Sequence, residues 1–366
     1  MAIFLFGLFL LITLINILFF IGYFSFASAK ESTSNATPPV SVIVCAKNEA
    51  ENLKDFIPLI LEQNYLNFEV ILVNDASVDD TLEVMEYFEE LDPRVHLVNV
   101  QNNEAFWGKK KYALTLGIKK AKNSTLLFTD ADCRPESNMW ISEMASNFQQ
   151  NKTIVLGYGG YLKNKGSFLN KLIRYETLLT AIQYFSFAKW GIPYMGVGRN
   201  LAYTSQEFYA QNGFATHLHI RSGDDDLFVN QAGTKENTVI TFNRASITRS
   251  IPKTDFSTWI LQKRRHISTA QFYKKKHKFL LVSFFVSQIG FWILLISLLL
   301  LKIHWPIVLG ILILRLLIQY IVYYKSAKKL DEMDLLWLIP FLEVFLIFTQ
   351  LSIFSMNVFS KPTNWK

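Results

Sequence analysis

Charged side chains are missing from long parts of this 366-residue chain. Residues 1–29 contain no charged side chain, and residues 279–301 contain none either. Two further apolar runs, residues 305–324 and 335–359, contain one charged side chain each. Because a helix needs about 20 mostly apolar residues to cross a hydrocarbon core, all four runs are long enough to span a membrane. The sequence therefore predicts an integral membrane protein with one N-terminal and three C-terminal transmembrane helices.

The first apolar run also lacks the marks of a cleaved signal peptide. No Lys or Arg precedes it, although Ala27-Ser28-Ala29 resembles a small-residue cleavage site. A signal peptide begins with a basic segment and has an apolar core of about 7–15 residues, which is shorter than this run. We therefore expect residues 1–29 to be retained as an anchor.

Charge and cysteine content indicate which side of the membrane the polar region occupies. The formal net charge is +7, and residues 253–278 hold eight Lys or Arg against one Asp, which is also +7. Basic residues next to a span mark the cytoplasmic side, so this charge is no indication of nucleic-acid binding. Two cysteines, Cys45 and Cys133, argue against a disulfide framework and fit a reducing compartment. We expect a multi-pass protein of the inner (cytoplasmic) membrane with a cytoplasmic catalytic domain and both chain ends outside the cytoplasm.

These features divide the chain into five parts. Residues 1–29 are the anchor, residues 30–252 the cytoplasmic domain, and residues 253–278 a basic amphipathic segment suited to the membrane interface. Residues 279–360 hold the three C-terminal transmembrane helices, and residues 361–366 form a short tail.

The first half of the cytoplasmic domain alternates strands with helices. Apolar runs predict strands at residues 40–46, 68–73, 95–100 and 125–129. The segments between them predict helices at residues 49–63, from Asp79 onward and at 109–121, with Asn48 as the N-cap of the first. Such an alternation predicts an α/β fold with a mostly parallel central sheet and helices on both sides. Further helices are expected near residues 168–188 and just after residues 224–226.

The tripeptide Asp130-Ala131-Asp132 follows the last of these strands. Residues i and i+2 of a strand point to the same side, so both carboxylates face one way at the carboxyl end of the sheet. Open α/β sheets bind ligands at that end. Hard oxygen ligands there suit a divalent cation that carries phosphate oxygens. The same tripeptide also occurs in ordinary turns, so the motif alone does not settle the function.

Polar residues at the other strand ends, in Ala46-Lys47-Asn48-Glu49 and at Asp75, should line the same crevice. With them the chain resembles a membrane-bound family 2 glycosyltransferase with the GT-A nucleotide-diphospho-sugar fold. It is similar to bacterial lipid-directed, ceramide-glucosyltransferase-like and polysaccharide-synthase-like members. The resemblance covers roughly residues 40–278 and rests on the segments 42–49, 73–81, 109–114, 130–132, 196–200, 223–226 and 262–266.

The resemblance implies a nucleotide-diphospho-sugar donor and Mg²⁺ or Mn²⁺ as cofactor. Asp132 and Asp130 would be the metal ligands. The donor would contact Ala46, Asn48, Glu49, Asp75, Lys110, Lys111 and Asp130. Each lysine of the run 109–111 is equally explained as part of a solvated helix face, and Asp75 as a turn residue.

The same resemblance implies that the acidic run Asp224-Asp225-Asp226 carries the general base. The family pattern places the base on Asp225, with Phe228 at the following apolar position, whereas a register with Leu227 there selects Asp224. An inverting transfer needs a carboxylate to take the proton of the acceptor hydroxyl, and an ordinary Asp pKa near ~4 keeps it ionised at neutral pH. The structural alternative is an acidic cluster that is favoured at a helix N-terminus.

An acceptor and diphosphate site is implied by two more segments, which contribute Gly198, Arg199, Asn200, Gln262, Arg265 and His266. Residues 262–266 resemble a Gln-x-x-Arg-Trp element in which His266 replaces the Trp. That Trp is associated with acceptor stacking in polymerising relatives, so the change argues against processive synthesis. Glycine turns and a positive-inside anchor are the structural alternatives.

Together these features favour an inverting, metal-dependent glycosyltransferase. It would move a sugar from a nucleotide-diphospho-sugar, most simply a UDP-sugar, to a lipid or lipid-linked acceptor at the cytoplasmic membrane face. The alternatives are a processive polysaccharide synthase, a nucleotidyltransferase, and a catalytically silent membrane scaffold or partner subunit.

One charged residue lies inside each of the last two apolar runs, Arg315 and Glu343. Counted from the loop between these runs, both lie roughly 12–14 Å deep if the runs are antiparallel helices. Isolated charges at that depth are costly, so we expect Arg315 and Glu343 to contact each other.

Overall fold

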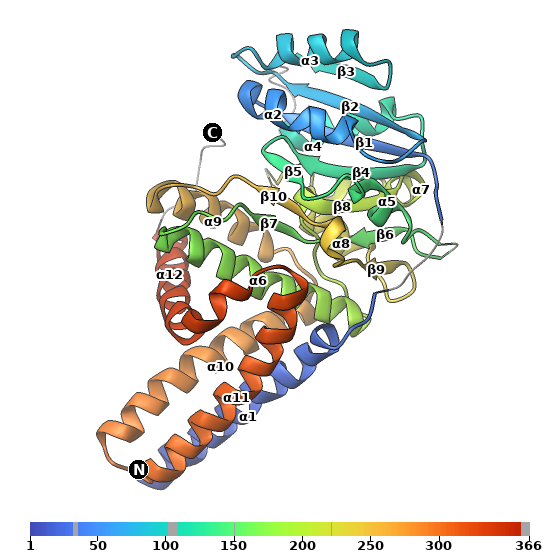
Figure 1. Ribbon diagram of the computed structural model, residues 1–366. Coiled ribbons are helices and arrows are strands. Elements are labelled where there is room, and N and C mark those ends of the chain that lie inside the picture. Colours follow the sequence, from blue (N-terminus) through green and yellow to red (C-terminus); the bar gives the residue numbers. More distant parts are fainter. Residues whose placement is uncertain (32–35, 102–108, 150, 221, 360–366) are drawn as a thin grey trace.

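The computed structural model describes residues 1–366 except 32–35, 102–108, 150, 221, 360–366 and the side chain of Lys109. An upper α/β domain sits on a bundle of long helices that projects away from it (Figure 1). The connection between them is continuous, because Tyr23 and Phe26 at the end of the first helix are buried in the same apolar core as the domain.

The central sheet confirms the predicted α/β fold. It has seven strands in the order β3-β2-β1-β4-β8-β6-β9 within the described residues. The first four strands in the chain pair in parallel, as expected, whereas β8 is antiparallel to both β4 and β6. Its strands are β1 (Val40–Ala46), β2 (Phe68–Asp75), β3 (Val95–Val100), β4 (Thr125–Asp130), β6 (Ile154–Leu156), β8 (Leu201–Thr204) and β9 (Thr238–Ile240).

Helices cover both faces of this sheet because its strands are apolar on both sides. On β4, Leu126 and Phe128 pack in the core that contains α4, whereas Leu127 packs in the core that contains α2, α3 and α5. The α-helices of the domain are α2 (Ala50–Leu61), α3 (Thr81–Leu91), α4 (Lys109–Lys120), α5 (Trp140–Ala145), α6 (Phe168–Lys189), α7 (Ser205–Ala210), α8 (Asp226–Ala232) and α9 (Phe256–Ala270). Short 3-10 helices are η1 (Gly198–Asn200), η2 (Ala215–His217) and η3 (Arg244–Ser246).

A second, three-stranded sheet was not predicted. It has the order β5-β10-β7 and is built from β5 (Cys133–Pro135), β7 (Gly159–Tyr161) and β10 (Thr248–Ser250). Strand β5 follows β4 after two residues, so this sheet continues the chain that carries Asp130 and Asp132.

The start of α2 differs from the prediction. The helix begins at Ala50 with Glu49 as its N-cap residue, and Asn48 adopts a left-handed φ of 55°. The side chain of Asn48 accepts a hydrogen bond from the backbone N–H of Val78, at 2.9 Å, instead of capping the helix. Asn48 therefore joins the ends of β1 and β2.

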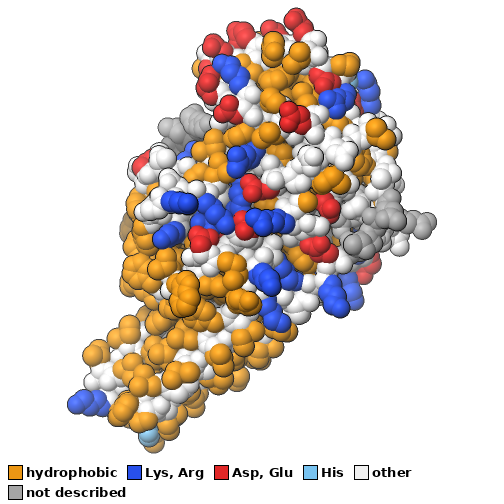
Figure 2. Space-filling view, viewed as in Figure 1, with side chains coloured by type: hydrophobic (Ala, Val, Ile, Leu, Met, Phe, Trp, Pro, Cys, Tyr) orange, Lys and Arg blue, Asp and Glu red, His pale blue; other side chains and the backbone are white. Residues whose placement is uncertain are grey.

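Within the part of the chain that the structure describes, four helical segments are long and apolar enough to cross a membrane, judged by length and composition. They are α1 (Ala2–Ala27), α10 (Lys275–Leu300), α11 (Trp305–Lys329) and the segment formed by η4 (Met333–Leu338) and α12 (Ile339–Phe359). Helices α1, α10 and α11 pack along one another, and hydrophobic side chains cover the bundle's surface (Figure 2). The basic segment 253–278 is divided between α9 and the first turn of α10, with a break at residues 271–274.

The expected contact between Arg315 and Glu343 is confirmed. Both guanidinium Nη atoms donate to the Glu343 carboxylate, and both side chains are buried. Arg315 Nε also donates to Asn16 Oδ1 of α1 at 3.1 Å, and Gln288 of α10 donates to Glu343 at 3.2 Å. This buried polar network links α1, α10, α11 and α12.

We predict that Arg315→Met destabilises the protein by about 3–5 kcal/mol, because it leaves the Glu343 carboxylate buried and unpaired. The double variant Arg315→Met/Glu343→Met should be more stable than the Arg315→Met variant, since no buried charge remains. Thermal unfolding in detergent or lipid nanodiscs measures both. The exposed pair of Lys54 and Glu51 is the matched control, and Lys54→Met should leave the melting temperature nearly unchanged. A double variant no more stable than Arg315→Met would contradict this explanation.

Candidate active site

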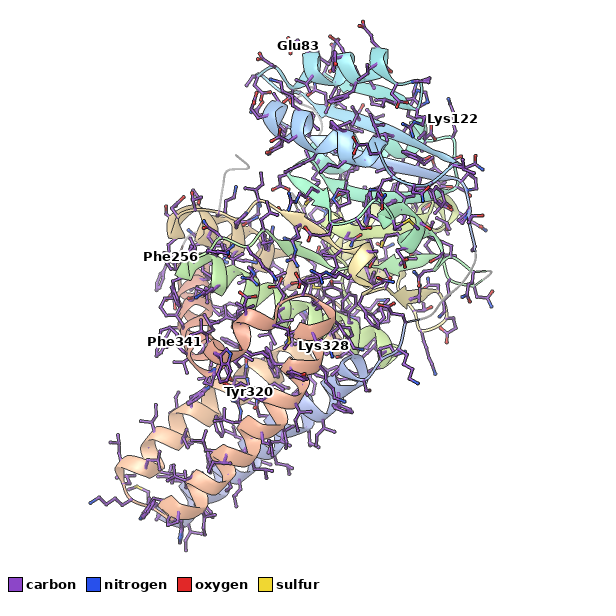
Figure 3. The ribbon with its side chains drawn as sticks, viewed as in Figure 1. Glu83, Lys122, Phe256, Tyr320, Lys328 and Phe341 are labelled. Carbon is purple, nitrogen blue, oxygen red and sulfur yellow. The ribbon has the colours of Figure 1, made fainter. Side chains whose placement is uncertain are left out.

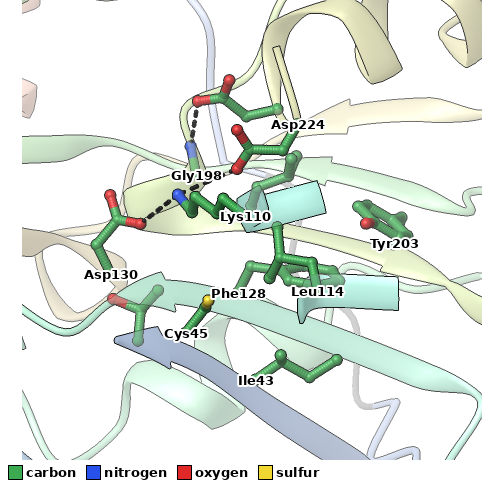
Figure 4. Close-up of a pocket in the computed structure, with 12 residues that line it drawn as sticks. Ile43, Cys45, Lys110, Leu114, Phe128, Asp130, Gly198, Tyr203 and Asp224 are labelled. Carbon is green, nitrogen blue, oxygen red and sulfur yellow. Dashed lines mark hydrogen bonds and ion pairs between the residues drawn. The ribbon is translucent and has the colours of Figure 1, made fainter. Parts of the chain in front are cut away.

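Lys110 joins two acidic segments that are far apart in the sequence. Its ammonium group on α4 lies 2.9 Å from an oxygen of Asp130 and 3.1 Å from an oxygen of Asp224 (Figure 4). Burial opposes the charged form, but the two carboxylates outweigh it and raise the pKa of Lys110 well above its usual value. The three side chains line one pocket with Cys45, Gly198 and Asp225.

Asp130 and Asp132 form a cluster that could hold a divalent cation. Ligand atoms of Asp130, Asp132 and Cys133 lie within 4.8 Å of one another. Burial raises the pKa of Asp132, and the charges of Asp130 and Glu49 add to this effect, whereas the charge of Arg199 opposes it. Burial also raises the pKa of the Cys133 thiol, which donates to Asp132 Oδ1. The two hard carboxylates fit Mg²⁺ or Mn²⁺, and a protonated thiol does not compete for such ions.

Asp225 and Asp224 have different environments although they are adjacent. Asp225 lies at the N-terminus of α8 and accepts hydrogen bonds from the backbone N–H groups of Gly198 and Asp226, both at 2.7 Å. Burial, followed by the charges of Asp224 and Asp226, raises the pKa of Asp225 to about 7. Burial acts in the same direction on Asp224, but Lys110 outweighs it and lowers the pKa of Asp224. The stronger base of the two is therefore Asp225.

Two residues expected at the ligand face are occupied elsewhere. The Lys111 ammonium is buried and donates to the backbone carbonyls of His217 and Ile220, at 2.7 and 3.1 Å. Burial lowers the pKa of Lys111 to about 8. Asn200 is completely buried, and its amide binds Trp140, Tyr158 and Ser246. In this structure both side chains hold loops in place, whereas the sequence analysis expected Lys111 at the donor and Asn200 at the acceptor and diphosphate site.

The remaining residues expected at the donor lie along the ends of β1 and β2. Ala46 pairs with Asn74 in the parallel register, and the backbone carbonyl of Asp75 accepts a hydrogen bond from Lys47. Asn48 and Glu49 line a shallow hollow together with Asp79 and Asp80. The charge of Glu49 acts on Asp132, so this hollow adjoins the acidic cluster.

Residues of η1 border the site on its other side. Gly198 lies beside Asp225, and a Cβ added to it would be 3.4 Å from Asp225 Oδ2. The Arg199 guanidinium lies 4.3 Å from the centre of the Tyr161 ring and donates to the carbonyl of Gly160. Its charge acts on Asp130 and Asp132, as a cation placed near bound phosphates would.

Helix α9 presents the element that contains Gln262, Arg265 and His266. Burial lowers the pKa of Arg265, and the carboxylates of Asp224 and Asp130 oppose this shift, so Arg265 faces the site. The His266 side chain is solvent-exposed, and the charges of Lys263 and Arg265 act on its ring more strongly than those of Arg199 and Lys110. Among the described residues, the buried Oε1 atom of Gln262 has no hydrogen-bond partner. A buried polar atom of this kind is expected where a ligand completes the bonding.

A buried charge cluster holds the strand beside Asp132. Strand β10 pairs with β5 at Ser250 and Cys133, and the N–H of Ile251 donates to the carbonyl of Asp132. The neighbouring Arg249 donates to Glu332, a fully buried residue between α11 and η4, at 2.8 Å. Glu332 also accepts from Arg174 of α6. Through Glu332, the loop between α11 and η4 is thereby connected to β10, the strand beside the acidic cluster.

The sequence analysis missed three participants in the site. Cys133 lies next to the acidic pair, Cys45 lines the pocket, and Glu332 anchors β10. The available signals were the position of Cys133, one residue after Asp132, and that of Cys45, one residue before Ala46. Glu332 is 200 residues away from Asp132 in the chain, and only the fold brings them together.

Comparison with known proteins agrees with this geometry. Residues 41–206 match the family model described as Glycosyl transferase family 2. An uncharacterized glycosyltransferase of Haemophilus influenzae is 29% identical over 156 residues, which cover 43% of this chain and 44% of that protein. The putative teichuronic acid biosynthesis glycosyltransferase TuaG of Bacillus subtilis is 26% identical over 149 residues, or 40% of this chain and 57% of that protein. The chain thus spans about half the length of these curated relatives.

The overall fold also has a solved counterpart. The mannosyltransferase PcManGT from Pyrobaculum calidifontis, solved in complex with GDP-Man and Mn²⁺, superposes with a TM-score of 0.58 at 17% identity. The similarity covers 92% of this chain and 95% of that one. At this identity the likeness shows the fold. Residues 41–206 are therefore similar in sequence to family 2 glycosyltransferases, and the chain has the GT-A fold.

Proposed function

We propose that this protein is an inverting, metal-dependent glycosyltransferase that moves a sugar from a nucleotide-diphospho-sugar to a lipid or lipid-linked acceptor. The observation that carries the proposal is that Asp130, Lys110, Asp224 and Asp225 line one pocket and that Asp132 lies beside Asp130. A pure scaffold has no use for a buried carboxylate with a raised pKa beside a potential metal site.

Asp225 is the proposed general base. Its carboxylate takes the proton of the acceptor hydroxyl while that oxygen attacks the anomeric carbon of the donor sugar. The bond from the anomeric carbon to the diphosphate breaks, the nucleoside diphosphate leaves, and the configuration at that carbon inverts. Gly198 positions Asp225 by the hydrogen bond from its backbone N–H, and the absence of a side chain leaves room for the acceptor.

The diphosphate needs positive charge as it leaves. Lys110 and Arg199 supply fixed charges beside Asp130. Asp130 and Asp132 would hold Mg²⁺ or Mn²⁺, which adds Lewis-acid stabilisation of the phosphate oxygens when bound. PcManGT, the structural neighbour solved with GDP-Man and Mn²⁺, supports this choice of ligand class.

The lipid acceptor is favoured by the position of α9. The helix carries Gln262 and Arg265, and its neighbour α10 is an apolar helix long enough to span a membrane. The basic residues at the start of α10 support a cytoplasmic position of the domain at the inner membrane. An acceptor held in a bilayer would therefore reach the pocket without leaving the lipid.

A processive polysaccharide synthase is the second candidate. The poly-beta-1,6-N-acetyl-D-glucosamine synthase of Staphylococcus aureus is 28% identical over 172 residues, or 44% of this chain and 40% of that protein. His266, in place of the Trp of polymerising relatives, supports single addition instead.

We predict that Asp225→Asn lowers sugar transfer by about 10²–10⁴-fold, because the amide cannot accept the hydroxyl proton. Membranes containing the full chain are incubated with labelled UDP-, GDP- or dTDP-sugars and Mn²⁺, and the label is partitioned between lipid, polymer and free nucleotide. Asp55→Asn, an exposed change on α2, is the matched control and should leave transfer unchanged.

Each outcome of this assay selects one function. Label in the lipid phase supports the proposal, and label in a high-mass polymer supports the second candidate. Transfer that is unchanged by Asp225→Asn excludes Asp225 as the general base, and the absence of transfer with every donor favours a scaffold.

The pH dependence of kcat/KM should follow the ionisation of Asp225. The base acts when ionised, so kcat/KM should rise with pH and level off above the pKa of about 7. In Asp224→Asn the rise should occur at lower pH, because the charge of Asp224 is one cause of the raised pKa. A profile that is flat between pH 5 and 8 would exclude Asp225 as the base with this pKa.

Gly198→Ala should reduce transfer by up to ~100-fold while the protein stays folded, because the methyl group intrudes on the space for the acceptor hydroxyl. The added Cβ meets only ordinary van der Waals contacts, so the melting temperature should change little. Gly310→Ala, where nothing lies within 4 Å of the added Cβ, is the matched control for both activity and melting. Full activity of Gly198→Ala would place the acceptor elsewhere.

A further inference from the structure

The N-terminal part of helix α12 contacts both the helix bundle and the base of the catalytic domain, where the ring of Phe345 lies 5.0 Å from that of Phe168 of α6. Glu343, near its N-terminal end, contacts Arg315 in α11 and Gln288 in α10. Gln288 is 13 residues after the first residue of α10, which is about 20 Å along that helix. Arg315 is 14 residues before the last residue of α11, which is again about 21 Å from the end that faces the catalytic domain. Both distances place Glu343 at the same depth.

The other end of α12 lies against the catalytic domain. Arg264 Nε of α9 donates to Asn357 Oδ1 at 2.9 Å, and Asn357 Nδ2 donates to the carbonyl of Arg264 at 3.3 Å. Helix α9 itself is fixed to that domain, because Lys263 pairs with Glu176 of α6 and Thr269 donates to Asp226 of α8. Both ends of α12 therefore contact the catalytic domain, the N-terminal end through Phe345 and the C-terminal end through Asn357.

A contact part-way along α12 indicates the direction in which this helix runs. The rings of Phe354 in α12 and Phe285 in α10 are 5.5 Å apart. Phe285 is nearer than Gln288 to the start of α10, so α12 moves toward the catalytic domain as the chain proceeds. Asn357 lies 14 residues after Glu343. These 14 residues span about 21 Å of helix, which is enough to reach from Arg315 to Arg264 of α9. Phe341 and Phe256 lie on one flank of the molecule, and the rings of Phe345 and Phe256 are 6.3 Å apart (Figure 3).

The outer face of α12 has the composition of a lipid-facing surface. Glu343 is its one charged residue, and that side chain is buried. The exposed face continues the apolar surface of the bundle (Figure 2). Its exposed side chains are the apolar Phe341, Phe348, Leu351, Phe354, Met356, Val358 and Phe359, with Ser352 and Ser355 between them. An exposed apolar surface of this size, next to helices that can span a membrane, is suited to contact with lipid acyl chains.

We propose that η4 and α12 form a re-entrant segment that enters and leaves the membrane on the catalytic-domain side. The exposed apolar face of α12 then packs against acyl chains of the leaflet next to that domain. Of the four apolar segments, α1, α10 and α11 cross, and the C-terminal end of α12 lies on the side opposite to the N-terminal end of α1. This arrangement differs from the expectation that both chain ends share one side, and it does not depend on the proposed transferase activity.

Paired cysteines in the full-length chain in native membranes test this arrangement. Arg264→Cys/Asn357→Cys joins α12 to α9, and Lys302→Cys/Asn357→Cys joins it to the turn between α10 and α11. A short bifunctional thiol reagent is added, and intramolecular cross-links are identified by mass spectrometry of the digested protein. The wild-type chain with Cys45 and Cys133 gives the background.

We expect the cross-link between positions 264 and 357 and none between positions 302 and 357. A helix that crossed the membrane from Glu343 would carry Asn357 about 21 Å further from the catalytic domain, toward Lys302, and would give the reverse result. Absence of the first cross-link, whether or not the second forms, overturns the proposal. Glu90→Cys/Asn357→Cys is the control for chance reaction, because Glu90 is exposed on α3 in the distal part of the catalytic domain.

Discussion

The arrangement of the site depends on one ammonium group placed between two carboxylates. Asp130 ends a strand, Asp224 precedes a helix about 90 residues later, and without a counter-charge the two would repel each other in a poorly hydrated pocket. Lys110 removes that repulsion and holds both segments at bonding distance. It also makes Asp224 less basic than its neighbour, which leaves Asp225 as the carboxylate suited to accept a proton. A single cation thus sets the geometry and divides the acidic residues by role.

Buried ion pairs also connect the catalytic domain to the apolar helices. Glu332 binds Arg249 and Arg174 at the base of the domain, and Arg315 binds Glu343 inside the bundle. Such pairs contribute little net stability compared with apolar packing, but an unpaired member is very costly. They therefore favour one relative position of domain and bundle over others. Arg249 holds strand β10, which pairs with the strand that follows Asp132. The position of the helix bundle therefore affects the position of the acidic cluster.

Sequence patterns predicted the strongly patterned parts of the molecule well. The strands β1 and β3 have the predicted bounds, and the predicted limits of α4 and α6 differ from the observed ones at one end only, by one residue. The second sheet was not predicted, because its strands have three residues each and no detectable period. The sequence also did not predict the direction in which individual side chains point. Lys110 and Lys111 are neighbours on one helix, yet one binds carboxylates in the pocket and the other binds buried backbone carbonyls.

The sequence by itself determined the parallel α/β half, the acidic pair after β4 and the apolar segments, because these depend on local periodicity and composition. The tertiary structure decided which polar residues face the pocket, because Asn200 and Lys111 donate hydrogen bonds to backbone carbonyls of loops that are distant in the chain. It also decided the direction of α12, since hydropathy measures the length of an apolar segment and not where its far end lies. That direction follows from the contacts of Glu343 and Asn357, which no local pattern contains.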